Sequence, residues 1–161
     1  MSAAAVIEQE KESETADPAG ALVGTLVHRL FQFTGVSDLS DEDLAVLAER
    51  LIRPEERVTA DAAALAERAA RVWRDLIRRP DVAEAVAGGE RLSEVPFSMM
   101  IDGRIVRGVI DAMIVRADEV LVLELKTGGP RPEHEQQLER YVRAARILFP
   151  DARVDGRLVY A

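Results

Sequence analysis

Two apolar segments of this chain each contain an acidic residue, which is an unusual place for a charge. Asp111 interrupts the apolar run 109–115, and Glu124 ends the apolar run 120–123. An unpaired carboxylate is costly to bury or becomes protonated, so such strands rarely contain one. The chain must therefore fold so that something compensates both acids. The simplest arrangement makes the two runs neighbouring strands of a sheet.

A lysine follows the second acid by two residues. Strand side chains alternate between faces, so Glu124 and Lys126 share a face, and Asp111 can meet them from the neighbouring strand. Two carboxylates and an ammonium group suit a hard divalent cation and the metal-dependent cleavage of phosphodiesters. The alternative is a buried Glu124–Lys126 ion pair that only completes the end of a strand.

Lysine is rare in this chain, which gives Lys126 more weight. Of 21 Lys and Arg residues, only Lys11 and Lys126 are Lys. A compact ammonium group can orient a water molecule or shield charge on a phosphate without filling the site, whereas a planar guanidinium cannot. The use of lysine here favours a functional role.

Composition limits the class of protein. The 161 residues, 48% of them hydrophobic, predict one domain with a substantial core. Cysteine is absent from the sequence, which excludes disulfides, zinc–thiolate sites and iron–sulfur clusters. The sequence contains neither a membrane-spanning apolar run nor a signal-peptide pattern, so we expect no membrane partner and a cytoplasmic location.

Net charge bears on how the chain would meet a nucleic acid. The formal net charge is −8. Neutralisation of phosphates dominates non-specific affinity for DNA, so this sign is unfavourable for a protein that binds DNA alone. We therefore expect another component to deliver the substrate.

The order of elements predicts the fold class. Residues 1–17 contain five acidic residues and one lysine and are predicted to be a disordered acidic tail or linker, followed by one domain over 18–161. Helices are expected at 18–33, 40–52 and 59–79, the last two within a helical insertion at about 38–87. Strands are expected at 92–101 and 104–115, joined by the hairpin signal Asp102-Gly103, and at 118–126. A helix at 132–148 and a strand at 153–160 complete an α/β fold with a mixed central sheet flanked by helices.

Five segments in this order resemble the PD-(D/E)XK nuclease superfamily, which has a restriction-endonuclease-like core. More narrowly, the chain resembles the RecB/AddA-type nuclease domain of bacterial helicase-nucleases. The segments are residues 24–28, 94–97, 108–111, 124–128 and 137–141, and the resemblance covers about residues 20–161. The sequence departs from the family pattern in two places. No proline precedes Asp111, and the usual Asp-aromatic-Lys is Glu124-Leu125-Lys126.

The resemblance implies a set of ligands for Mg²⁺ or Mn²⁺. They are His28, Asp111, Glu124 and the backbone carbonyl of Leu125. The alternative for His28 is a packed core histidine bonded to a carbonyl.

The resemblance also implies roles for four other residues. Lys126 would position or activate the attacking water. Glu94 would not bind the metal directly, and at most it would interact with a residue that does. Gln137 and Tyr141, one turn apart on a helix, would contact the DNA backbone. The alternatives are a surface amide for Gln137 and ordinary helix packing for Tyr141.

The function that follows is a metal-dependent deoxyribonuclease of low sequence specificity, with exonuclease action favoured over endonuclease action. It would act on single strands or duplex ends supplied by a helicase motor, on the same polypeptide or on a partner subunit, during bacterial double-strand break processing and recombinational repair. Two other classes remain open. One is a non-catalytic DNA-binding or scaffolding module of the same fold, and the other is a stand-alone restriction-type or phage-type nuclease.

Overall fold

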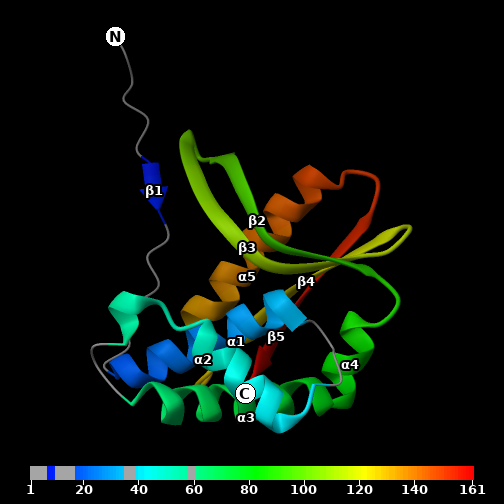
Figure 1. Cartoon of the computed structure of the whole chain (residues 1–161). Helices are drawn as coiled ribbons and strands as arrows, with labels where there is room; N and C mark the ends of the chain where they lie inside the picture. The colour runs from blue at the N-terminus through cyan, green and yellow to red at the C-terminus, as the bar shows by residue number, and fades with distance from the viewer. Residues whose placement is uncertain (1–6, 10–16, 35–38, 58–60) are drawn as a thin grey trace. The chain divides into compact units, whose positions relative to one another are not determined.

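The computed structural model describes residues 7–9, 17–34, 39–57 and 61–161 (Figure 1). Two compact units make up the chain. The sheet unit contains residues 1–13, 88–124 and 131–158, and the helical unit contains residues 14–87, 125–130 and 159–161. Two strands begin in the sheet unit, and their last residues belong to the helical unit.

The sheet is mixed, as the sequence predicted. Its strands are β1 (Ile7–Gln9), β2 (Glu90–Ile101), β3 (Arg104–Val115), β4 (Glu119–Lys126) and β5 (Arg153–Tyr160). The order is β1-β3-β4-β5, and β2 also pairs with β3. Strands β2 and β3 are antiparallel, as are β3 and β4, whereas β1 and β3 are parallel. The β2–β3 turn has φ 49° at Asp102 and φ 78° at Gly103, the positive angles that a tight hairpin requires.

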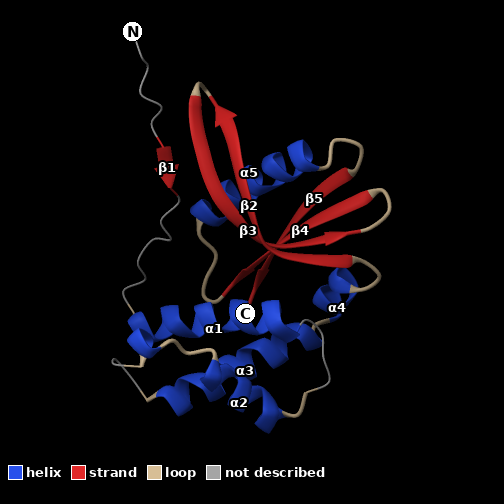
Figure 2. Cartoon of the chain, turned by 45° about the horizontal axis from the view of Figure 1, so that its top comes forward, coloured by secondary structure: helices blue, strands red, loops and turns tan. Residues whose placement is uncertain are grey.

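A helix connects the last two strands. The backbone hydrogen bonds from Arg153 N to Asp118 O and from Ala161 N to Lys126 O, both 2.9 Å, show that β4 and β5 run in the same direction. Parallel neighbours need a crossover, which is α5 (Pro132–Leu148). This helix packs on the sheet through its buried side chains (Figure 2). They are Tyr141, Ala144 and Ala145.

The helical unit contains α1 (Pro18–Thr34), α2 (Asp41–Arg50), the 3₁₀ turn η1 (Pro54–Glu56), α3 (Ala62–Arg78) and α4 (Pro80–Val86). Helix α3 packs against both α1 and α2 and buries Trp73 completely. Side-chain caps begin three of the helices, because each N-cap oxygen accepts a bond from an amide that has no partner within the helix. The caps are Asp17, Ser40 and Asp61.

Several sequence predictions need correction. The predicted helix 40–52 ends at Arg50, and Pro54 begins a separate 3₁₀ turn. The short helix α4 was not predicted. Residues 7–9, within the predicted tail, form a short strand that pairs with β3. The predicted helix end at Gly35 and the predicted helix start near Thr59 lie outside the described residues.

Candidate functional site

The pairing of β2 with β3 is interrupted at one position. The register pairs Ser93 with Ala112 and Val95 with Ile110, but in these two fully described strands the intervening pair, Glu94 with Asp111, is missing. Glu94 has a φ of 53°, in the left-handed region that strains a residue with a side chain. Such strain is characteristic of functional sites. The interruption therefore marks the position of Asp111 as a candidate site.

The inward-facing pattern of both strands also changes there. On β3, Val106 and Met113 belong to the same apolar cluster, although they are seven positions apart. On β2, Leu92 and Phe97 pack in the same cluster, although they are five positions apart. Regular alternation would put the members of each pair on opposite faces. Irregularities of this kind redirect side chains next to active sites.

A second acid follows the end of the β3–β4 pairing. The register between these strands ends with Ala112 opposite Leu123, and Asp111 and Glu124 are the next residues of the two strands. Glu94, Asp111 and Glu124 therefore lie on three adjacent strands beside positions where the strand pairing stops, and we call these three acids the acid row.

Burial increases along the acid row. Glu94 is exposed, Asp111 is half-buried, and Glu124 is 0% exposed. Neighbouring carboxylates repel one another, so they require a positive charge or take up a proton. Carboxylate oxygens are also the ligands that hard divalent cations prefer. The acid row has the chemistry of a cation site that opens toward solvent at Glu94.

The helical unit contains three other predicted site residues, His28, Leu125 and Lys126. A Cβ atom on Gly24 of α1 would lie 2.6 Å from Thr127 Oγ1, so glycine is needed where α1 approaches this segment. Lys126 directly precedes Thr127. His28, which is half-buried, lies one helical turn beyond Gly24 and therefore on the same side of α1.

These residues and the acid row belong to different units of the chain. The boundary falls within β4, where Glu124 ends one unit and Leu125 begins the other. Within the described part of the chain, no three His, Cys, Asp or Glu side chains gather as metal ligands. The roles of His28 and Lys126 stay predictions.

Gln137 and Tyr141 lie together on α5. The Gln137 Nε2 group donates a 2.8 Å hydrogen bond to the Tyr141 hydroxyl. The Tyr141 side chain is only 4% exposed, and its ring meets Phe97 edge-on at 5.7 Å between centroids. Phe97 lies three residues from Glu94, so this pair packs α5 against the strand that carries one end of the acid row. Contact of either residue with DNA stays a prediction.

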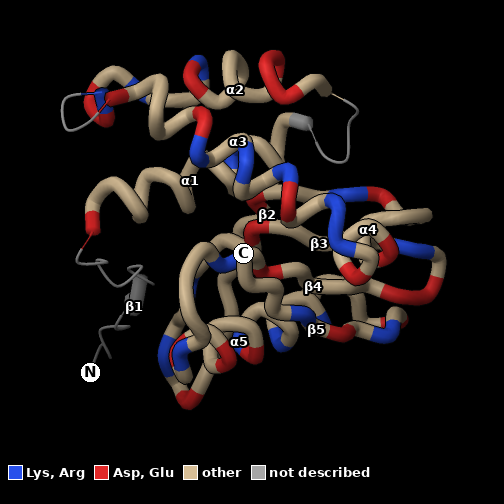
Figure 3. The backbone as a smooth tube through the Cα atoms, turned by 90° about the horizontal axis from the view of Figure 1, so that it is seen from below, with Lys and Arg blue, Asp and Glu red and all other residues tan. Residues whose placement is uncertain are grey.

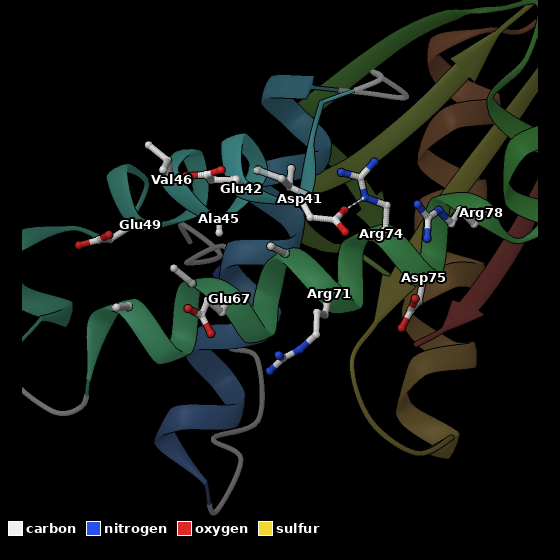
Figure 4. A pocket seen from close by; sticks show the side chains of 14 residues that line it. Asp41, Glu42, Ala45, Val46, Glu49, Glu67, Arg71, Arg74, Asp75 and Arg78 are labelled. Carbon is white, nitrogen blue, oxygen red and sulfur yellow. Dashed lines mark ion pairs between the residues drawn. The ribbon is translucent and has the colours of Figure 1, made fainter.

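A groove elsewhere in the helical unit contains none of the predicted site residues. It lies between α2 and α3 and has a volume of about 580 Å³ (Figure 4). Arg74 closes one part of it through a 2.9 Å ion pair with Asp41 and also donates a hydrogen bond to Leu39 O. Basic and acidic residues are interspersed along the chain (Figure 3). The carboxylates that line the groove are all at least partly exposed, whereas Glu124 of the acid row is fully buried, so we place the candidate site at the row.

A comparison with protein families identifies the superfamily of the chain. A family model of the PD-(D/E)XK nuclease superfamily matches residues 3–161. The chain belongs to this superfamily. PD-(D/E)XK proteins are nucleases that generally use divalent metals, which fits the mixed sheet and the carboxylates of the acid row. No curated protein sequence matches the chain.

Two solved structures resemble this PD-(D/E)XK chain. The crystal structure of SSO0001 shares 20% identity over 88% of this chain and 70% of that one, with a TM-score of 0.36. The crystal structure of protein VC1899 from Vibrio cholerae shares 14% identity over 92% of this chain and 48% of that one, with a TM-score of 0.35. No helix within the described ranges is long and apolar enough to cross a membrane.

Proposed function

We propose that this protein hydrolyses phosphodiester bonds of DNA with the help of Mg²⁺ or Mn²⁺ bound at Asp111 and Glu124. One observation carries the proposal: Asp111 and the fully buried Glu124 directly follow the last paired residues of β3 and β4, next to a break in the pairing of β2 with β3. Two carboxylates in such surroundings need a compensating positive charge. Membership of the superfamily makes a divalent cation the best-supported source of that charge.

Other residues complete the ligand set in this proposal. The backbone carbonyl of Leu125 offers a neutral oxygen beside Glu124, and His28 offers an imidazole nitrogen. When bound, the cation would polarise the phosphate and lower the pKa of a water molecule. Glu94 would accept hydrogen bonds from water around the ligands, and its left-handed backbone would direct its carboxylate there.

The substrate-side roles fall to three side chains. Lys126 shares a face of β4 with Glu124, so its ammonium group would hold the attacking water and balance charge on the phosphate. The Gln137 amide and the Tyr141 hydroxyl would contact the backbone of the DNA. Their hydrogen bond to one another holds these polar groups together on α5.

The finer biological role is also part of the proposal. We infer exonuclease action on single strands or duplex ends within a RecB/AddA-type helicase-nuclease, with a helicase motor delivering the DNA during double-strand break processing in the bacterial cytoplasm. The resemblance of the five sequence segments supports this context. The net charge of −8 supports the need for a partner that delivers the DNA.

Digestion of linear and circular DNA, single- and double-stranded, in Mg²⁺, in Mn²⁺ and in EDTA tests the proposal. The wild-type chain should cleave only with a cation present, and Asp111→Asn and Lys126→Ala should each abolish turnover while the melting temperature stays near the wild-type value. Asp151→Asn, which removes an exposed carboxylate in a turn, is the matched control and should leave cleavage unchanged. Undiminished digestion by Asp111→Asn protein would refute the nuclease assignment. DNA binding by the wild-type chain without cleavage would instead favour a non-catalytic module.

A further inference from the structure

The outer part of the β2–β3 hairpin has one covered face and one open face. The covered face packs into the apolar cluster that includes α5, through Phe97, Met99 and Val106. The open face consists of three cross-strand pairs, which we call the ribbon face. The pairs are Met100 with Ile105, Ser98 with Arg107, and Pro96 with Val109.

The ribbon face has an unusual composition for a surface in water. The open side of an antiparallel sheet is normally polar. Here Met100 is 59% exposed and Val109 is 39% exposed, and Pro96 is exposed beside Val109. Contiguous exposed apolar side chains on a soluble protein indicate a binding surface.

A single cation lies in the middle of these apolar side chains. Arg107 is exposed and forms no ion pair with any residue in the described ranges. Elsewhere Arg79 and the exposed Arg153 pair with Asp81 and Asp155 at 2.7 Å. Arg107 thus offers a positive charge in a setting where apolar groups can contact the same anionic partner.

The ribbon face leads to the acid row. Beyond Pro96 and Val109, the two strands continue to the break in their pairing at Glu94 and Asp111. Arg107 precedes Asp111 by four residues, which is roughly 13 Å of extended strand. A linear anionic ligand along the ribbon would thus arrive at the carboxylates after passing Arg107.

We propose that the ribbon face binds a single strand of DNA and leads it to the acid row. Arg107 contacts a phosphate, and Met100, Pro96 and Val109 pack against unpaired bases. A single strand fits better than a duplex, because apolar side chains can pack on bases only where the bases are unpaired and accessible. This inference rests on the proposed function, since it treats Asp111 and Glu124 as the destination of the strand.

Binding of a fluorescein-labelled oligothymidylate, followed by anisotropy over a series of salt concentrations in EDTA, tests the proposal. Arg107→Ala should weaken binding at low salt and reduce the slope of log K against log salt by about 0.7, the value for one lost phosphate contact on a single strand. Arg143→Ala is the matched control, because Arg143 is exposed on α5 and its loss changes the net charge equally. It should leave the slope unchanged.

A second variant separates base packing from charge. Met100→Ser should weaken oligothymidylate binding without altering the salt slope, and it should have little effect on binding to a blunt duplex. Ile147→Ser is its control, since Ile147 is 61% exposed on α5. Melting temperatures near that of the wild type would show that all four variants are folded.

Two results would overturn the ribbon assignment. One is wild-type affinity and slope in Arg107→Ala protein. The other is self-association of the wild-type chain that Met100→Ser abolishes while DNA binding is unchanged, which would assign the ribbon face to a second copy of the chain. Neither result affects the proposed nuclease function, which is decided by cleavage in Mn²⁺ by the wild-type and Asp111→Asn chains.

Discussion

The absence of a side chain at Gly24 allows α1 to approach Thr127. Replacement by alanine would place a Cβ atom 2.6 Å from Thr127 Oγ1, closer than real contacts allow. Alanine is the better helix former by about 1 kcal/mol, so the two effects oppose each other. We expect the clash to dominate and Gly24→Ala to lower the free energy of unfolding by about 1–3 kcal/mol in urea denaturation.

A double-mutant cycle identifies the contact as the cause. Thr127→Ala removes Oγ1 and leaves its Cβ 3.9 Å from the added atom, so the double variant should recover most of the loss. Gly129→Ala is the control, because no atom lies within 4 Å of its added Cβ. Equal losses at Gly24 and Gly129, without rescue, would contradict the close approach.

His28 lies one turn beyond Gly24, and its predicted role as a ligand can be separated from a role in packing. A metal ligand must present an unprotonated ring nitrogen, so Mn²⁺ affinity should fall as the pH drops through about 6.5. We expect His28→Ala to weaken Mn²⁺ binding roughly tenfold or more in calorimetric titration, which is about 1.4 kcal/mol. Wild-type Mn²⁺ affinity together with a lower melting temperature would show instead that His28 only packs in the core.

At the residue scale, the sequence predicts the acids better than their surroundings. Asp111 and Glu124 could be identified because each lies in or ends an apolar run, and charges there need a reason. The left-handed backbone of Glu94 could not be identified, because glutamate gives no sign of a positive φ. The sequence of the strand did contain one signal of an irregularity near Glu94. Leu92 and Val95 are three positions apart, which breaks the alternation of apolar residues in a regular strand.

At the scale of elements, one ion pair joins α1 to η1. Arg29 donates hydrogen bonds to both carboxylate oxygens of Glu56, at 2.7 and 2.8 Å, and a third to Leu51 O at 2.8 Å. Glu56 also accepts a 2.8 Å bond from the backbone N–H of Arg53. The hydrogen bonds from Arg29 hold the pKa of Glu56 below its ordinary value, and the amide of Arg53 contributes in the same direction.

This lowered pKa predicts how stability depends on pH. A carboxyl whose pKa is lower in the folded state stabilises the fold above its unfolded pKa, and the contribution disappears as the pH falls through the folded pKa. Glu56→Gln should therefore cost about 1–2 kcal/mol at neutral pH, and the difference from wild type should vanish in acid below the ordinary pKa of glutamate. Urea denaturation at several pH values measures this difference. Glu55→Gln, at a neighbouring exposed position, should show little difference at any pH.

The elements that the sequence predicted well are those with strong local signals. Asp102-Gly103 predicted the hairpin, and Ser40, where the second helix was predicted to begin, is the side-chain cap of α2. The helical turns η1 and α4 were not predicted, although each has proline at its first position, Pro54 and Pro80, which favours the start of a helical turn. The strand at 7–9 was missed because its pairing with β3 is nearly a hundred residues away in the chain and leaves no local pattern.

At the scale of the whole molecule, charge limits how the chain can bind DNA. The formal net charge is −8, and the acid row adds local repulsion at the point where a phosphate would be cleaved. Arginine is far more common than lysine, but several arginines are occupied in pairs with acids, as in Arg29–Glu56 and Arg74–Asp41. The net negative charge gives little overall attraction for phosphates, so affinity must come from a small number of local contacts.

We therefore expect the isolated chain to bind and cleave DNA weakly, and only at low salt. Each phosphate contact to a single strand contributes about 0.7 to the slope of log K against log salt, so even a few contacts make binding fall as salt approaches physiological levels. The affinity measured by anisotropy and the cleavage rate measured by digestion should both decrease across the same salt series. Addition of Mg²⁺ or Mn²⁺ should support cleavage only at salt concentrations where the chain still binds DNA. Sub-micromolar binding to duplex DNA at physiological salt would contradict this expectation and show that the chain needs no partner to deliver its substrate.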